Sequence, residues 1–327
     1  MPEPRFAEKR FQCGHTISIY WQTITKMFYL HACAQSKELG STLYWSQSVD
    51  EVKGWSWLTD NEKRDLRNGL QRSWNINDTG HLHYNLPLYV GQRIRLTEKI
   101  DNSGDQDLNL MQEAEGTVVH IVPDPRDPCN NTKRGIKLKY CPVGVWVRMD
   151  KCKKAPLQTL LEQRNVIPDS FNNKEWTPTH DVDDDPGKPK KEEQFHKMSQ
   201  KLVFIKASQR TFQREFLGKQ WSVVRRQLPI TSAQHRTVQS SQGYTLRKGI
   251  LLDLGNLNTC PMNHWLNVYV MLSRGISLYN LLILRCPPKS FFDEGPPKYL
   301  RQFLRDIEGL RNETVTAAKK AAQTLGL

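Results

Sequence analysis

The segment Gly249-Ile-Leu-Leu-Asp-Leu-Gly255 decides the fold class of this chain of 327 residues. Its apolar run between two glycines predicts a buried β-strand, and Asn280-Leu-Leu-Ile-Leu284 predicts a second one. Between them, the apolar side chains of residues 264–274 recur at helical spacing and predict a helix. Because a strand, a helix and a strand of this size form a right-handed crossover between parallel strands, the sequence predicts an α/β fold with a parallel sheet.

Two motifs adjoin this unit. Thr237-Val-Gln-Ser-Ser-Gln-Gly-Tyr-Thr-Leu246 places small hydroxyls and a glycine ahead of the first strand. Tyr269-Val-Met-Leu-Ser-Arg274 ends the helix with a guanidinium, which stays charged at any working pH. Together the two motifs predict two parts of one nucleotide-sensing surface.

These motifs resemble the last two motifs of superfamily-1 DNA helicases of the Pif1/RecD-like type, which run roughly T-x-H-K-S-Q-G-x-T-x and Y-V-A-L-S-R. Gln239 and Ser240 stand where the family usually carries His and Lys. The specific part of the resemblance is confined to Gln242-Gly243 and Ser273-Arg274. Upstream, residues 86–97 and 115–119 are similar to strands of a small inserted β-module of the family, and residues 42–49 carry a weaker signal.

The resemblance implies a role for each site residue. Arg274 would be the arginine finger that stabilises charge on the transferring phosphate of ATP, and Gln242 and Gly243 would contact the nucleotide, with Gln242 also linking to the DNA site. Thr237 would contact a DNA phosphate, with Arg236 beside it. Three structural alternatives stay open: Arg274 bonded to the last carbonyls of its own helix, Thr237 as a helix N-cap, and Gly243 in an ordinary turn.

The sequence contains no G-x-x-x-x-G-K-[ST] loop to hold the phosphates of ATP and no obvious pair of strand-end acids for Mg²⁺. Phosphoryl transfer depends on positioning and charge stabilisation, so an arginine finger without a phosphate-binding loop has no fixed substrate. We therefore expect ATP and Mg²⁺ to bind only when a separate N-terminal P-loop lobe completes the site. Whether the chain is an enzyme stays open, and alone we expect it to be inactive.

The charge balance indicates a polyanionic partner. The chain has 47 basic and 34 acidic residues, a formal net charge of +13. Single-stranded DNA or DNA junctions are the expected partners, although a merely basic surface would give the same count. No apolar run approaches the length that crosses a bilayer, so no membrane partner is expected.

The cysteines indicate a reducing compartment. None of the seven forms a C-x-x-C pair, and they are too sparse for a disulfide scaffold of this length. Cys129, Cys141 and Cys152 near His120 leave a zinc site as an alternative. The N-terminus lacks an apolar signal core. We expect a soluble intracellular protein, for which the nucleus and the mitochondrion both fit.

The sequence predicts five segments. The fold expected from them is a partial RecA-like parallel sheet with an inserted small SH3-like β-barrel and a C-terminal helix. Residues 16–38 have a helical pattern, a strand follows at 42–45, and residues 1–15 show no strand ahead of that helix. The segments are 1–85 and 201–292 as two parts of the RecA-like lobe, 86–155 as the β insertion, 156–200 as a flexible linker, and 293–327 as the terminal helix.

The β insertion carries the second set of candidate DNA contacts. Arg93 and Arg95 alternate on one predicted strand and would lie on one face of the barrel, which is either a nucleic-acid-binding face or a solvated one. Leu300, Phe303, Ile307 and Leu310 mark the expected packing face of the terminal helix. The predicted barrel strands are 93–97, 116–122, 136–140 and 143–148, and the later predicted strands are 202–205, 220–224 and 227–230.

Two functions of different class explain these patterns. The first is the C-terminal portion of an ATP-dependent 5′-to-3′ DNA helicase that binds single-stranded DNA and supplies Arg274 to ATP held by a missing lobe. The second is a non-catalytic nucleic-acid-binding remnant of such a helicase. A protein-interaction domain with a basic surface would leave the pairing of the two motifs unexplained.

Overall fold

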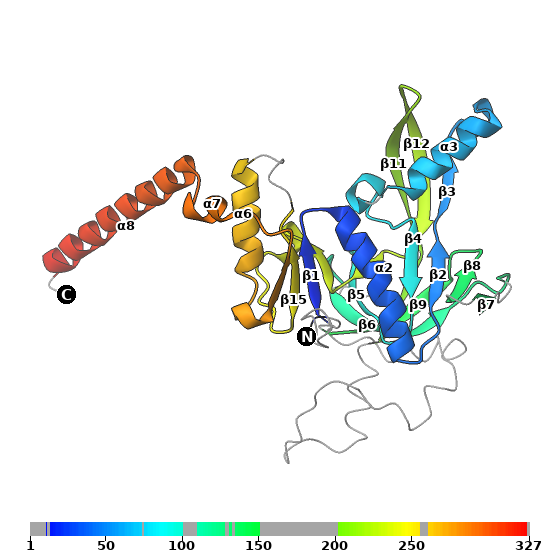
Figure 1. Cartoon of the computed structure of the whole chain (residues 1–327), viewed down its shortest axis with the longest axis horizontal. Helices are drawn as coiled ribbons and strands as arrows, with labels where there is room; N and C mark the ends of the chain where they lie inside the picture. The colour runs from blue at the N-terminus through cyan, green and yellow to red at the C-terminus, as the bar shows by residue number, and fades with distance from the viewer. Residues whose placement is uncertain are drawn as a thin grey trace, which may run out of the picture. The chain divides into compact units, whose positions relative to one another are not determined.

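The structure is a computed structural model that describes residues 11, 14–73, 75–100, 110–127, 131–132, 135–150, 202–255 and 261–325 (Figure 1). The chain divides into two compact units, the first from residues 1–23 and 236–327 and the second from residues 24–235. The predicted linker at 156–200 lies outside the described residues. The segment boundaries predicted from the sequence stay predictions.

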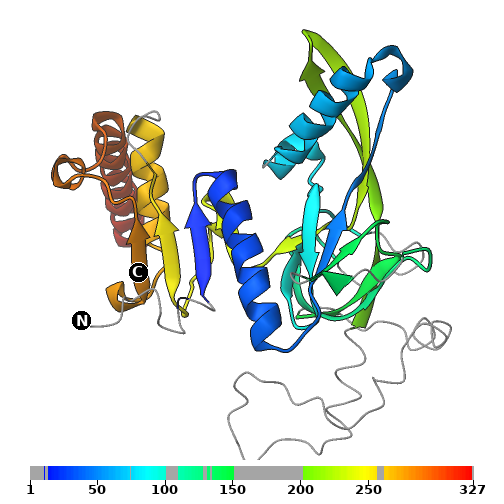
Figure 2. The same cartoon turned by 45° about the vertical axis from the view of Figure 1, so that its right-hand side comes forward.

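The first unit is built on a four-stranded sheet in the order β14-β1-β15-β16. β15 pairs in parallel with β1 on one side and with β16 on the other. In Figure 2, β1 (blue) lies beside β15 (yellow), and α6 (gold) covers the sheet. The α/β class is confirmed, and β15, α6 and β16 follow one another as predicted, with the two strands parallel. The elements are β14 (His235–Thr237), β1 (His15–Ser18), β15 (Ile250–Asp253), β16 (Leu281–Leu284) and α6 (Pro261–Leu272).

The sequence prediction was wrong at the start of this sheet. Residues 16–18 belong to β1, and the helix α2 begins later and spans Trp21–Glu38. Ile17 is fully buried and pairs with Leu252 of β15, so burial in the sheet overrides the helical spacing. A strand therefore does precede the first helix, although the sequence predicted none in residues 1–15.

The second unit contains a five-stranded antiparallel sheet in the order β10-β9-β6-β5-β13. Leu96, Val118, Val145 and Val147 of this sheet are fully buried in its core. The strands predicted at 93–97, 116–122, 143–148 and 202–205 are confirmed here. Their observed bounds are β5 (Arg93–Leu96), β6 (Glu115–Val122), β9 (Gly144–Met149), β10 (Leu202–Lys206) and β13 (Ile230–Ser232).

The predicted SH3-like barrel is not confirmed. The strand expected at 136–140 forms as β8 (Gly135–Leu138), but it pairs in parallel with β2 (Tyr44–Gln47) rather than with the other three. It belongs to a separate sheet in the order β4-β2-β8-β7, with β4 at Asn85–Leu88 and β7 at Asn131–Thr132. The strand near 42–45 therefore forms two residues later than predicted and does not join the sheet of the first unit.

A long hairpin completes the second unit. β11 (Ser208–Phe216) and β12 (Lys219–Gln227) pair along their whole length, and β3 (Val49–Val52) extends the sheet from β12. Helix α3 (Asp60–Gln71) packs Leu66 and Leu70 onto the same apolar cluster as Trp221. The strand predicted at 227–230 is wrong, because β12 ends at Gln227 and β13 begins only at Ile230.

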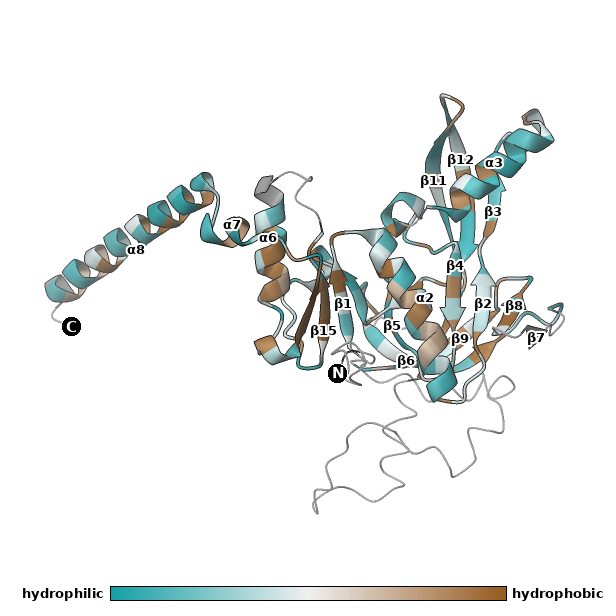
Figure 3. Ribbon diagram, in the orientation of Figure 1, coloured by the Kyte–Doolittle hydropathy of each residue, from teal (hydrophilic) through white to brown (hydrophobic). Residues whose placement is uncertain are grey.

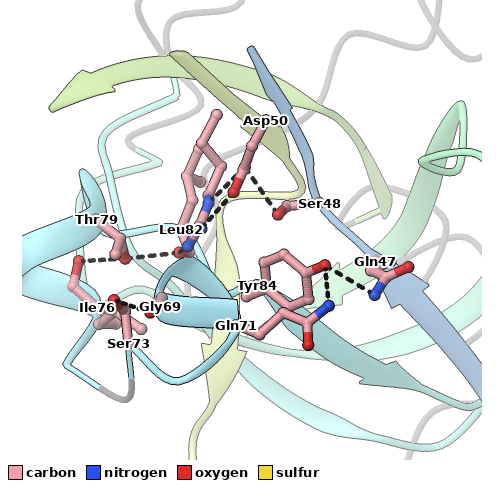
Figure 4. A network of polar contacts seen from close by, with 11 residues as sticks. Gln47, Ser48, Asp50, Gly69, Gln71, Ser73, Ile76, Thr79, Leu82 and Tyr84 are labelled. Atoms are coloured by element: carbon pink, nitrogen blue, oxygen red, sulfur yellow. Dashed lines mark hydrogen bonds and ion pairs between the residues drawn. The ribbon is translucent and has the colours of Figure 1, made fainter. Parts of the chain in front are cut away.

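A buried ion pair joins the hairpin to β3. Arg225 of β12 has no exposed surface, and its Nε and Nη2 lie 2.8 and 2.6 Å from the two carboxylate oxygens of Asp50 in β3. Its Nη1 donates to the Leu82 carbonyl at 3.2 Å. Figure 4 shows Asp50 accepting a further bond from Ser48, and Tyr84 nearby accepting from Gln47 and Gln71.

The remaining elements of the described chain are helices and 3₁₀ turns. Four 3₁₀ turns are η2 (Trp55–Trp57), η3 (Ile76–Thr79), η7 (Gln239–Ser241) and η8 (Leu278–Asn280). The chain continues with α7 (Lys289–Asp293) and α8 (Lys298–Leu325). The predicted packing face of the terminal helix is not buried by the described chain, since Phe303, Ile307 and Leu310 are exposed. Figure 3 shows apolar and polar residues interspersed along α8, and no described helix is long and apolar enough to cross a membrane.

Replacing Arg225 by Met leaves the Asp50 carboxylate buried without its guanidinium. We expect the free energy of unfolding, measured with urea, to fall by about 3–5 kcal/mol. Arg210→Met is the matched control, because it breaks an ion pair with Glu98 in which the arginine side chain is half exposed. That loss should stay below about 1 kcal/mol. Equal losses in the two variants would contradict the assigned role of the buried pair.

Buried imidazoles in the second unit make its stability depend on pH. His31 Nδ1 lies 3.0 Å from His235 Nε2, and His83 Nε2 lies 2.7 Å from Thr231 Oγ1. Burial lowers the pKa of His31 to about 4. Burial, with the charges of Arg95 and Arg225, lowers the pKa of His83 to about 3.

The unfolded chain therefore takes up protons before the folded chain does. Stability from these groups is complete above the unfolded pKa of about 6.5 and is lost as the pH falls toward the folded values. His31→Leu removes one such group, so its free energy of unfolding should fall less steeply with acidification, by about 1.4 kcal/mol per pH unit. Urea titrations at several pH values between 6.5 and 4 measure this, and identical slopes would contradict it.

Candidate functional site

The loop that follows β14 is folded by its own hydroxyls. Thr237 Oγ1 accepts a hydrogen bond from the Ser240 backbone N–H at 3.2 Å, and Ser240 Oγ donates to the Thr237 carbonyl at 3.2 Å. Ser241 Oγ donates to the Val238 carbonyl at 2.7 Å. These bonds close the turn η7. Thr237 thus bonds the backbone of the turn, but the N-cap position of η7 is occupied by Val238 and not, as the structural alternative would require, by Thr237.

The residues after this turn present backbone to solvent. Gln242 and Gly243 are exposed, and Gly243 has a φ of +78°, in the left-handed region that favours glycine. A Cβ added at Gly243 would meet no heavy atom within 4 Å. The glycine is therefore required by the conformation of the turn and not by crowding within the chain. The space beside its backbone is open to a ligand.

Arg274 joins the second motif to this loop. Its Nη1 donates to the Tyr244 carbonyl at 3.0 Å, and its Nε donates to the Val270 carbonyl of α6 at 3.0 Å. Its Nη2 lies 2.8 Å from Ser273 Oγ. The backbone joins the same segments, because the Leu246 N–H donates to the Arg274 carbonyl at 2.8 Å. The two predicted motifs are thus in direct contact, and the alternative in which Arg274 bonds the end of its own helix is also realised.

Arg236 supports the loop from within. It is 1% exposed, its Nη1 donates to the Ser240 carbonyl at 3.0 Å, and its guanidinium carbon lies 4.2 Å from the centre of the Tyr244 ring. Burial of this charge argues against the predicted contact of Arg236 with a DNA phosphate. Its observed contacts assign it to holding the loop that carries Gln242 and Gly243.

The two candidate DNA-binding residues on β5, Arg93 and Arg95, are both paired with acidic side chains. Arg93 donates to both oxygens of Asp150, at 2.8 and 2.6 Å, and to Glu115 at 3.1 Å. Arg95 is buried, forms an ion pair with Glu113, and donates through Nε to the Ser232 carbonyl at 3.1 Å. The structure therefore places neither guanidinium on an uncompensated cationic face, which argues against their predicted role in binding nucleic acid.

A polar cluster at the carboxyl edge of the parallel sheet was missed. Asp253 at the end of β15 is buried and accepts bonds from Ser18 Oγ at 3.0 Å and from Arg285 Nε at 2.7 Å. Burial opposes ionisation of Asp253, but hydrogen bonds from Arg285, Thr23 and Ser18 hold its pKa below the ordinary value. The signal in the sequence was an aspartate closing an otherwise apolar strand.

The contacts of Asp253 decide whether its carboxylate can bind a cation such as Mg²⁺. Arg285 has a φ of +49°, and its guanidinium carbon lies 4.9 Å from the centre of the Tyr20 ring. With its carboxylate paired to this guanidinium, Asp253 is not a free ligand for Mg²⁺. Within the described ranges, no three His, Cys, Asp or Glu side chains are grouped to hold a metal ion. Cys129 and Cys152 of the zinc alternative lie outside those ranges, and Cys141 is a buried free thiol.

Comparison with solved structures finds Pif1 helicases. The Pif1 helicase from Candida albicans is 16% identical over 90% of this chain and 49% of that chain, with a TM-score of 0.47. Bacteroides Pif1 in complex with ADP-AlF3 and ssDNA is 14% identical over 94% of this chain and 48% of that chain, with a TM-score of 0.46. The chain spans about half the length of these helicases. No protein-family model and no curated protein matches the sequence.

Proposed function

We propose that this chain acts as the C-terminal portion of a Pif1-like, ATP-dependent 5′-to-3′ DNA helicase. In this role it binds single-stranded DNA and presents Arg274 to ATP and Mg²⁺ held by a separate P-loop lobe. The observation that supports the proposal most strongly is the 3.0 Å contact between Arg274 Nη1 and the Tyr244 carbonyl. It joins the loop and the helix end that the resemblance assigns to one nucleotide-sensing surface.

The chemistry of the proposed site follows from the acceptors of Arg274. All three are neutral oxygens, two carbonyls and one hydroxyl. A phosphate oxygen is a stronger acceptor for a guanidinium than a carbonyl is, because the bond is between opposite charges. Arg274 would therefore exchange a neutral acceptor for the transferring phosphate when the P-loop lobe brings ATP to the loop. An arginine finger elsewhere contributes about 10³–10⁵ in rate.

Single-stranded DNA is the proposed nucleic-acid partner. We expect basic side chains to bind it mainly through electrostatic attraction to its phosphates. Arg247 and Lys248 are exposed directly after the loop, and neither forms an ion pair among the residues that the structure describes. They take the place of Arg236, Arg93 and Arg95 as the proposed cationic contacts. Binding of this kind tolerates any base and falls steeply with salt.

The second function is a non-catalytic nucleic-acid-binding remnant. One observation favours it: the strand-end carboxylate Asp253 is already paired with Arg285 and is not free for Mg²⁺. The two functions differ in whether Arg274 affects the hydrolysis of ATP once a P-loop lobe is supplied.

To test the proposed arginine finger, the purified P-loop lobe of a Pif1 helicase is added to the chain, and the rate of DNA-stimulated hydrolysis of ATP is measured. The chain alone should not hydrolyse ATP. The restored rate should fall by about 10³-fold or more in the Arg274→Ala variant. Arg305→Ala, which removes an exposed arginine of α8, is the control that keeps both Arg274 and the proposed DNA contacts. A restored rate that Arg274→Ala leaves unchanged would refute the finger, and a chain that binds DNA but restores no hydrolysis would favour the non-catalytic remnant.

The proposed DNA contacts are tested by salt dependence. Fluorescence anisotropy of a labelled oligothymidylate gives the association constant at several salt concentrations. Charge reversal of both Arg247 and Lys248 to Glu should flatten the plot of log K against log salt by about 1.4, since each single-strand phosphate contact contributes about 0.7. Reversing Lys319 and Lys320 on α8 changes the net charge equally and should leave the slope unchanged. Salt-insensitive binding by the natural chain would count against the proposal.

A further inference from the structure

Helix α8 carries an apolar seam that the described chain does not cover. Phe303 is 57% exposed, Ile307 44% and Leu310 63%, and Leu300 is half-buried. The side chains of residues 301–321 are exposed all around the helix. A helix with only water around it gains little from its apolar residues, because most helical stability in proteins comes from packing an apolar face.

The spacing of this seam is that of a coiled coil. The large apolar residues from Leu300 to Leu310 are separated by three, four and three residues, which is a repeat of 3.5 residues, and smaller side chains continue the same spacing to residue 321. A seam at this spacing stays in contact with a partner helix through a left-handed supercoil. The a and d positions are Leu300, Phe303, Ile307, Leu310, Thr314, Ala317 and Ala321.

We propose that α8 pairs with α8 of a second copy of this chain as a parallel, in-register, two-stranded coiled coil. Ile307 at an a position followed by Leu310 at a d position is the combination that favours parallel dimers. The inference concerns a surface apart from the nucleotide-sensing loop and does not rest on the proposed function.

The charges beside the seam select the parallel orientation. In a parallel in-register pair, a g residue faces the e residue of the following heptad on the partner helix. Asp306 at g and Arg311 at e are opposite in charge, so the two-fold symmetry gives two attractive contacts. An antiparallel pair would instead set the acidic g positions, Asp306 and Glu313, against each other.

The contacts that these groups make within one helix leave them accessible to a partner. Asp306 accepts a bond from Gln302 at 2.8 Å, and Arg311 lies 3.3 Å from Glu308. Both pairs are on the exposed surface of α8, where such contacts are weak and are readily exchanged.

The composition of the seam predicts a modest affinity. Large apolar residues occupy its first half, but Thr314, Ala317 and Ala321 offer little area, and Gly309 at a c position weakens the helix. We expect the full chain to exist as a monomer and a dimer in exchange, with a dissociation constant on the order of 10 µM.

Sedimentation equilibrium of the full chain between about 1 and 200 µM tests the proposal, since a reversible dimer changes its population across this range. Ile307→Asp places two carboxylates in the seam and should raise the dissociation constant by at least about 100-fold. Val315→Asp is the matched control, because Val315 is equally exposed at 45% but lies at a b position, off the seam. It should change the dissociation constant by less than about twofold. Circular dichroism verifies that both variants remain folded.

Charge exchange tests the orientation. Asp306→Arg sets arginine against Arg311 of the second copy and should weaken the dimer by about 10-fold, and the double variant Asp306→Arg, Arg311→Asp should restore it. A chain that is monomeric throughout, or a dimer that Ile307→Asp and Val315→Asp affect equally, would overturn the seam. A dimer that the double variant fails to restore would overturn the parallel register.

Discussion

The parallel pairing of two short strands, β1 and β15, holds the first unit together. Ser18 of β1 and Asp253 of β15 are 235 positions apart in the sequence. Both strands are buried, and Ser18 donates to the Asp253 carboxylate where they end. Because β15 also pairs with β16, this contact fixes the sheet onto which α6 packs and from which Arg274 and its loop are held. All of the second unit lies within the chain between those two strands.

The loop after β14 shows how one guanidinium can join two segments. Arg274 closes the end of α6 through Val270 and, at the same time, holds the loop through Tyr244. Arg236 holds the same loop from its buried side. The exposed segment at Gln242 and Gly243 is therefore fixed at both ends while its backbone faces solvent. Such preorganisation reduces the ordering that a ligand would otherwise have to impose.

The sequence predicts local structure well wherever one pattern dominates. The strand at Ile250–Asp253 is a continuous apolar run between glycines, and its crossover to Leu281–Leu284 followed from that run. β1 was missed because its four residues lead directly into a helical pattern, and only burial against β15 distinguishes them. Periodicity carries no information on which strands pair, so the partner of β8 was unpredictable.

The candidate site residues show the same difference between local patterns, which the sequence reveals, and long-range contacts, which it does not. Arg274 and the loop came together as the motifs indicated, since both flank one crossover. Arg95 and Arg236 look like surface cations in the sequence, but Glu113 and the Tyr244 ring contact them, and no local spacing reveals these contacts.

The insertion of the second unit between β1 and β15 has a consequence for synthesis. At about 5–20 residues per second, β1 leaves the ribosome some 10–50 s before β15 exists, so its edges must stay clear of other chains during that interval.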